Sequence, residues 1–344
     1  MKLLNFIYLF LFALTAACSP GSQHFSANHK KILPPDYGIY NGAFPDMGST
    51  EDSVTFARLK AFENLTGKKP AWVYFSDNWF SGIKFPVQKA EIIRSYGSVP
   101  FIRLMPRKDF HENNSDPFYS LKKIADGNFD GELTEYANDV KKFGGPVMIE
   151  FGTEMNGDWF PWSGVYSNGN PGIFKNAYIH IIEIFRKQKA ENVTWVFHVN
   201  YDSSPKENWN RMSDYYPGDE YIDWIGMSIY GAQHPNDEWV NISGIFETAY
   251  KELAAVSVNK PLAVFEFGVI ENKLKPEWIK DFFSIIKDKK FSRIKGISYW
   301  HSNWDNQDGS YSFMRIDSSP ESLEEYKKNI SDNFFHNQIN LKEQ

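Results

Sequence analysis

The chain has 344 residues, a formal net charge of −6 and a single cysteine. A negative chain without a basic stripe argues against a nucleic-acid partner, and one cysteine excludes an intramolecular disulfide or a cysteine-rich metal site. No pair of histidines has zinc spacing, so we expect no catalytic metal and no cofactor. Aromatic residues make up 17% of the chain, including 11 tryptophans; this surplus over the needs of a core fits contact with carbohydrate.

The first 17 residues have the pattern of a secretory signal and are expected to lie outside the fold. A positive residue precedes a largely apolar run, 3–14, which is too short for a membrane span. LTAAC, ending at Cys18, resembles a bacterial lipoprotein cleavage box, in which the cysteine becomes the lipidated N-terminus. Thr15 stands where the usual box has leucine, and an ordinary secreted protein is the alternative. We expect a lipid-linked tether over 18–31 that holds the protein to a membrane of the bacterial cell envelope.

Beyond the tether, eight strand-like runs alternate with helical ones. Strands are expected at 36–44, 70–75, 99–104, 146–151, 193–199, 221–230, 261–267 and 294–300; helices are expected at 51–63 (capped by Ser49 or Thr50), 87–96, 132–143, 173–190, 245–256, 276–287 and 319–330, with a short one near Trp209. This alternation predicts an α/β fold, a single-domain (β/α)8 TIM barrel, over 32–340. An open doubly wound sheet would need a glycine-rich turn after an early strand, which YNGAFPDMG does not supply. The irregular stretch 107–127 is expected to form one wall of a cleft.

The stretch 145–164, GPVMIEFGTEMNGDWFPWSG, places polar and aromatic residues after a buried strand. An apolar run of strand length stops at Gly152. A carboxylate, an amide and large rings follow: Glu154, Asn156, Asp158, Trp159, Phe160 and Trp162. Carboxylates carry proton and nucleophile chemistry, and flat rings stack on sugars. The stretch predicts a carbohydrate site on the barrel rim, the alternative being a surface loop whose tryptophans pack on neighbours.

In a (β/α)8 barrel the active site lies at the C-terminal ends of the strands. The residues expected there are Arg103, Glu150, Glu154, Asn156, His198, Asn200, Ser228, Tyr230, Glu266, Trp300, His301, Asn303 and Trp304. His198 and His301 are either sugar contacts or structural residues, and both readings stay open. Glu266 lies in the apolar run VFEFG, where a charge must be paired or used. Arg103 is the partner that a purely structural Glu266 would need.

Glu154 and Glu266 are two carboxyl groups on one rim, which is the minimum equipment for glycoside hydrolysis. One must be protonated and give its proton to the leaving oxygen. The other must be ionised and attack the anomeric carbon or activate a water.

These motifs resemble glycoside hydrolase family 26, a family of retaining (β/α)8 glycosidases, from YGIY to YWHSNWDN. TEMNGDWFPW, VFEFG and SIYG carry the resemblance, which implies that Glu154 is the acid/base and Glu266 the nucleophile. It also implies substrate or nucleophile contacts from Trp159, Trp162, Tyr230 and Trp300, to which we add the rim residues Asn156, Arg103 and Asn200. The implied protein is a monomeric retaining endo-β-glycanase acting on a β-linked polysaccharide, with β-1,4-mannan as the first expectation.

One departure from the family bears on the substrate. Many members, β-mannanases especially, have histidine directly before the acid/base, where this chain has Thr153. Mixed-linkage β-glucan and β-1,3-xylan therefore stay open as substrates beside mannan. The alternative of another class is a non-catalytic carbohydrate-binding barrel, against which the presence of both acids argues. Glu150 is the next candidate for the acid/base if Glu154 does not have that role.

Overall fold

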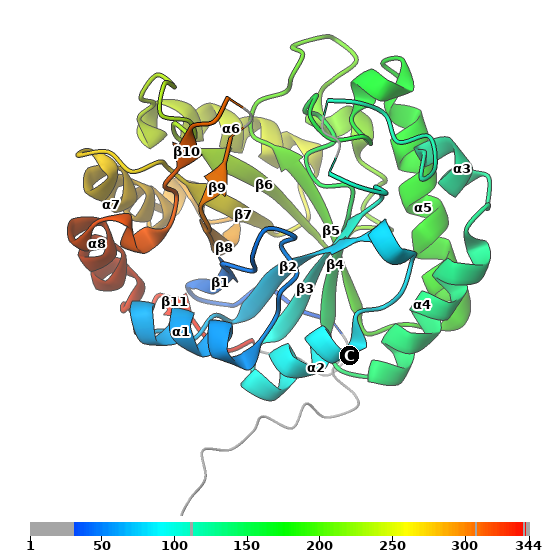
Figure 1. Ribbon diagram of the computed structural model, residues 1–344, viewed down its shortest axis with the longest axis horizontal. Helices are drawn as coiled ribbons and strands as arrows, with labels where there is room; N and C mark the ends of the chain where they lie inside the picture. Colours follow the sequence, from blue (N-terminus) through cyan, green and yellow to red (C-terminus); the bar gives the residue numbers. More distant parts are fainter. Residues whose placement is uncertain (1–30, 111–112, 307, 340, 342–344) are drawn as a thin grey trace, which may run out of the picture.

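The centre of the protein is a closed barrel of parallel strands. The computed structural model describes residues 31–110, 113–306, 308–339 and 341, and Figure 1 shows the strands gathered inside a ring of helices. The barrel strands are β1 (Ile39–Pro45), β2 (Trp72–Asn78), β3 (Val99–Met105), β4 (Val147–Phe151), β5 (Val193–Asn200), β6 (Trp224–Tyr230), β7 (Leu262–Gly268) and β8 (Ile294–His301). Each pairs with the next in chain order, and β1 also pairs with β8, so that Pro45 lies opposite His301. The predicted (β/α)8 fold is confirmed.

Helices on the outside of the barrel connect most successive strands, and a 3-10 turn lies between β5 and β6 (Figure 1). They are α1 (Phe56–Thr66), α2 (Val87–Tyr96), α3 (Leu121–Ala125), α4 (Asp130–Phe143), α5 (Pro171–Gln188), α6 (Ile242–Val256), α7 (Lys275–Ile286) and α8 (Pro320–Ile330), with short turns η1 (Trp79–Ser81), η2 (Gly164–Ser167), η3 (Met212–Tyr215), η4 (Lys289–Phe291) and η5 (Ile316–Ser318). A small hairpin, β9 (Trp304–Asp305) and β10 (Tyr311–Ser312), follows β8, and β11 (Phe335–His336) pairs with β1. Within the described ranges, no helix combines the length and apolarity needed to cross a bilayer.

The start of the first helix was predicted wrongly. Neither Ser49 nor Thr50 caps it, because the side chain of Thr55 accepts from the backbone N–H of Arg58 and α1 begins at Phe56. Glu51 instead stays in the β1–α1 loop with a left-handed backbone, φ 58°. The short helix expected near Trp209 is the 3-10 turn η3, a few residues later, and the stretch 107–127 is irregular apart from α3. Cys18 and nearly all of the predicted tether lie outside the described residues.

A tryptophan fills the interior of the barrel and requires two glycines. A Cβ atom at Gly42 would lie 1.9 Å from the Trp72 indole nitrogen, and one at Gly296 would lie 2.3 Å from the far edge of the same ring. The buried indole N–H donates to Ser298 Oγ at 2.8 Å. The Trp72 ring therefore occupies the space that side chains on β1 and β8 would otherwise take.

Candidate active site

Glu154 lies after β4 on a constrained backbone. The backbone at Gly152 and at Glu154 is in the left-handed conformation, with φ 58° and 55°. Glycine is required at 152, because a Cβ atom there would lie 2.9 Å from Phe174. The same conformation costs about 1–2 kcal/mol at Glu154, whose backbone N–H is held by the carbonyl of His198 at 2.9 Å. Strain of this kind gathers at functional positions, where the surrounding structure enforces it.

Trp159 turns back onto Glu154. Its indole nitrogen donates to Glu154 Oε2 at 3.0 Å, and the ring is only partly buried. The pairing therefore fixes one carboxylate oxygen of Glu154 and presents an aromatic surface beside it. These two predicted site residues are brought together by the structure.

Asn156, Trp162 and Asn200 form the framework of the same loop. Asn156 is fully buried; its amide donates to the carbonyl of Asn200 at 2.8 Å and accepts the N–H of Asn200 at 2.8 Å. Trp162 is buried, donates to the carbonyl of Thr153 at 2.7 Å and stacks on Phe160. The Asn200 side chain donates to a backbone carbonyl at 2.7 Å. Because these groups face protein, sugar contact by the three residues remains a prediction.

Glu266 lies near the end of β7, buried and oriented by donors on both oxygens. Tyr230 donates to Oε2 at 2.8 Å, Tyr74 lies 3.1 Å from Oε1, and Arg103 Nη2 lies 3.5 Å from Oε1. Burial raises the pKa of the Glu266 carboxyl to about 7 against the opposing charge of Arg103, and the charge of Glu154 adds to the rise. Arg103 thus pairs with Glu266, as the structural reading required, but it does so within a cluster that also contains Glu154.

Glu150 supports this cluster from inside β4. It is fully buried and contacts the Tyr74 hydroxyl, His198 Nδ1 at 2.8 Å and Arg103 Nε at 3.5 Å. Burial opposes protonation of His198, but the charge of Glu150 and its hydrogen bond raise the pKa of the imidazole. His198 also lies 3.0 Å from Thr153 Oγ1 and, through Nε2, 2.9 Å from Ser228. His198 is thus a buried member of the polar network.

Three members of the site were missed from the sequence. Tyr74, on β2, contacts both Glu150 and Glu266. Glu51 lies 3.2 Å from Arg103 Nη1 and accepts from Ser76 Oγ at 2.6 Å. Alternation along β2 places Trp72, Tyr74 and Ser76 on one face, and this period of two was the available signal.

Trp300, on β8, packs flat against an aromatic ring of β1. Trp300 stacks on Phe44 with ring centroids 3.7 Å apart, and the guanidinium of Arg103 lies 5.1 Å from its ring centre. His301 is buried, as Trp300 is, and accepts the backbone N–H of Ile316 at 3.1 Å. Burial, with the charge of Arg315, lowers the pKa of His301 to about 3. This contact gives His301 a structural role, whereas Trp300 stays next to the charged cluster.

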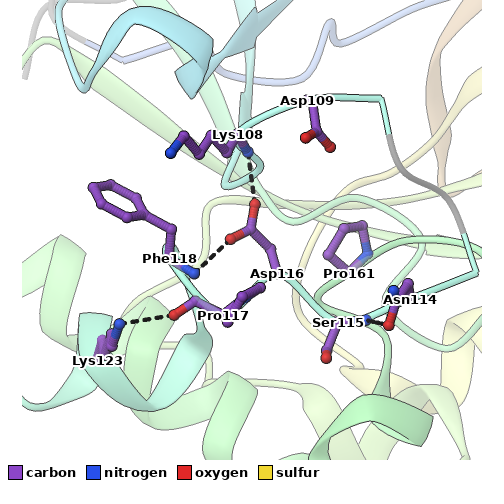
Figure 2. Close-up of a pocket in the computed structure, with 9 residues that line it drawn as sticks. All are labelled: Lys108, Asp109, Asn114, Ser115, Asp116, Pro117, Phe118, Lys123 and Pro161. Carbon is purple, nitrogen blue, oxygen red and sulfur yellow. Dashed lines mark hydrogen bonds between the residues drawn. The ribbon is translucent and has the colours of Figure 1, made fainter.

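A surface pocket of about 420 Å³ lies beside the loop that carries Trp159 and Trp162, and Pro161 of this loop lines it. Figure 2 shows its lining, in which Asp116 accepts the backbone N–H groups of Lys108 and Phe118. The stretch predicted to wall a cleft therefore lines this pocket, and the backbone N–H of Asn113 ties the stretch to the carbonyl of Trp159 at 2.8 Å. Neither Glu154 nor Glu266 lines the pocket, so it is separate from the carboxylate cluster.

A (β/α)8 barrel that brings two carboxyl groups to the ends of its strands has the architecture of a glycoside hydrolase. The chain belongs to glycosyl hydrolase family 26, whose family model matches residues 120–308. It is 30% identical over 299 residues to endoglucanase H of Acetivibrio thermocellus, covering 85% of this chain and 31% of that protein. It is 28% identical over 204 residues to mannan endo-1,4-β-mannosidase of Bacillus subtilis strain 168, covering 54% and 49%.

A solved structure shares the fold. The catalytic domain of the endo-β-1,4-mannanase of Bacillus sp. JAMB-750 matches with a TM-score of 0.64 over 87% of each chain, at 18% identity. The chain spans 31% and 49% of the length of the two relatives above. The family and the fold are therefore established.

Proposed function

We propose that the protein is a retaining endo-β-glycanase in which Glu266 is the nucleophile and Glu154 the acid/base. The observation that carries the proposal is the setting of Glu266. Its two oxygens are contacted by Tyr230, Tyr74 and Arg103. These contacts orient the carboxylate and stabilise its ionised form in a buried site. Glu154, held by Trp159, is the second acid near it.

The two steps follow double displacement. First, a Glu266 oxygen bonds to the anomeric carbon while the bond to the leaving sugar breaks and the Glu154 proton passes to the leaving oxygen. This gives a glycosyl ester on Glu266 and a carboxylate on Glu154. Second, Glu154 takes a proton from water, the water oxygen bonds to the anomeric carbon, and the ester bond breaks to restore Glu266. Retention requires the two carboxyl groups to lie about 5–5.5 Å apart.

We propose β-1,4-mannan as the first candidate for the substrate. The mannan endo-1,4-β-mannosidase relative supports this choice, since it aligns over about half of each chain. The partly buried ring of Trp159 offers an aromatic surface beside Glu154 on which a pyranose ring can stack, and the Trp300 ring lies next to the charged cluster.

A β-linked glucan is the second candidate, favoured by the residue before the acid/base. Thr153 is buried and lies 3.0 Å from His198 Nδ1, so its hydroxyl belongs to the polar network below the cleft. The family resemblance associates histidine at this position with β-mannanases. The relative that aligns over 85% of the chain is named an endoglucanase, which agrees with a glucan backbone.

One experiment tests both substrates and the catalytic class. Purified protein is incubated with β-1,4-mannan, mixed-linkage β-glucan and β-1,3-xylan, and new reducing ends and product lengths are measured. We expect oligosaccharides on one of them, with the β configuration retained in proton NMR. Glu266→Ala is the control for contaminating hydrolases. Polysaccharide retention without reducing ends would instead identify a carbohydrate-binding barrel, and an α product would reject the retaining mechanism.

We propose further that a lipid on Cys18 anchors a monomeric catalytic domain, 32–340, to the cell envelope. Several acyl chains, as on a bacterial lipoprotein, hold a protein firmly at a membrane. Cys18→Ser should move the protein from the membrane fraction to the soluble fraction while its activity on soluble glycan stays unchanged. Native protein found already in the soluble fraction would end this proposal.

A further inference from the structure

Two buried carboxylates, Glu150 and Glu266, share the same two partners, Tyr74 and Arg103. The Tyr74 hydroxyl contacts Glu150 Oε1 and lies 3.1 Å from Glu266 Oε1. The guanidinium of Arg103 lies 3.5 Å from the same two oxygens, through Nε to Glu150 and through Nη2 to Glu266. Glu150 is fully buried beneath the rim, so its carboxyl takes no direct part in the two steps above.

Tyr74 has one hydrogen to donate and two carboxylates to receive it. His198 Nδ1 lies 3.1 Å from Tyr74 Oη but 2.8 Å from Glu150 Oε2, so the imidazole hydrogen is assigned to the carboxylate. The tyrosine hydrogen then goes to Glu150 or to Glu266, and never to both. Burial and the charge of Glu150 hold the pKa of Tyr74 well above its ordinary value, so the hydroxyl remains a donor in either arrangement.

We propose that Tyr74 is a positioning residue for the nucleophile, and that its hydroxyl turns from Glu150 to Glu266 when the Glu266 carboxylate is ionised. This inference rests on the proposed role of Glu266. In the first step Glu266 becomes a neutral ester, and a hydroxyl held for it alone would lose its charged acceptor inside the protein. Glu150 remains an acceptor for Tyr74 and an ion-pair partner for Arg103 throughout, so both stay in place until the ester is cleaved.

The charged and titratable groups that face Glu266 come from five strands and the turn after β4. They are Tyr74 on β2, Arg103 on β3, Glu150 on β4, Glu154 after β4, His198 on β5 and Tyr230 on β6. A hydrogen bond donated by the Tyr74 hydroxyl favours the ionised form of Glu266 over the protonated form. Removing it should therefore raise the pH at which Glu266 ionises, which is a readout that loss of packing alone would not move.

The test is the pH profile of kcat/KM for Tyr74→Phe, on whichever glycan the wild-type protein hydrolyses. We expect the acid limb to move up by about one pH unit and the plateau to fall about 10-fold. The matched control is Tyr178→Phe, which also removes a buried phenol hydroxyl. Tyr178 donates to the carbonyl of Val196 at 2.6 Å and not to a carboxylate. Its acid limb should coincide with that of the wild type.

A second variant keeps the test decisive if Tyr74→Phe does not fold. Replacing Tyr74 by 3,5-difluorotyrosine preserves the ring and makes the hydroxyl a stronger donor, so the acid limb should move to lower pH. Opposite shifts in the two variants support the proposal. An acid limb that stays at the wild-type position in active variants would overturn the role of Tyr74 alone, whereas a wild-type protein inactive on every glycan would overturn the proposed function.

Discussion

The indole nitrogen of Trp159 lies 3.0 Å from Glu154 Oε2, five residues back along the chain. The turn that makes this possible places Glu154 at φ 55°, so the backbone and the tryptophan together fix the direction of the carboxyl group. The same residue thus orients the proposed acid/base and presents a partly exposed aromatic ring beside it.

Trp159→Phe should keep an aromatic ring, although a smaller one, and remove the indole donor. A hydrogen bond to a charged group contributes about 1.5–3 kcal/mol net, but Trp159 is only partly buried, so we expect about a 10-fold loss of kcat/KM on polysaccharide. The matched control is Trp162→Phe, whose indole donates to a buried backbone carbonyl. That variant should lower the melting temperature more than it lowers activity. Equal activity losses in both variants would contradict a specific role for the Trp159 donor.

Glu266→Ala should abolish hydrolysis of every substrate by several orders of magnitude, because no other group supplies the nucleophile. Azide should then restore some turnover by attacking the anomeric carbon from the vacated side. The product would be a glycosyl azide of inverted configuration, identified by NMR. A retained azide product from this variant would mean that another residue had acted as the nucleophile.

Glu154→Ala should make the loss of activity depend on the leaving group. An aryl glycoside with an acidic phenol needs little protonation, whereas a polysaccharide needs much. We expect the first step to survive on the aryl substrate and azide to speed the second step with retained configuration. Equal losses on both substrates would remove Glu154 as the acid/base. Glu150 would then be the next candidate, although it lies fully buried under Tyr74 and His198.

The barrel could be predicted from the sequence because buried parallel strands are read as short apolar runs between glycines and prolines. The strand predicted at 99–104 is Val99–Met105 in the structure, and the strand predicted at 261–267 is Leu262–Gly268. Glu266 was singled out because a carboxylate inside such a run is costly without a use, and Glu154 because it is a second acid just past a buried strand.

The inner network could not be predicted because its members are far apart in sequence. Tyr74 is 76 residues from Glu150 and 192 from Glu266. Glu51 was assigned to a helix because apolar residues of helical spacing follow it, although the Thr55 cap excludes it from α1. Its contact with Arg103 spans 52 residues. Local periodicity identifies which strand a residue occupies, but only the closed barrel shows which side chains meet.

The pKa of Glu266 predicts that activity and stability change with pH in opposite directions. Its carboxyl must be ionised to attack, so kcat/KM should rise as the pH passes through about 7. For stability, the folded pKa of about 7 lies above the unfolded value of 4.5. Between these pH values the folded state binds more protons than the unfolded state, so the free energy of unfolding falls as the pH rises. The difference between these two pKa values corresponds to about 3 kcal/mol in the free energy of unfolding.

Glu266→Gln isolates this contribution, because glutamine resembles the protonated acid and does not titrate. Other buried groups, such as Asp77 with its pKa raised by burial to about 7, affect both proteins alike and cancel in the difference. Denaturant unfolding of the two proteins at pH 4 and pH 8 should therefore show nearly equal stability at pH 4, where Glu266 is protonated in both the folded and the unfolded state. At pH 8 the variant should be the more stable by up to about 3 kcal/mol, while lacking activity. A variant that is less stable than the wild type at pH 8 would mean that Arg103 and Tyr74 stabilise the ionised carboxylate by more than burial costs it.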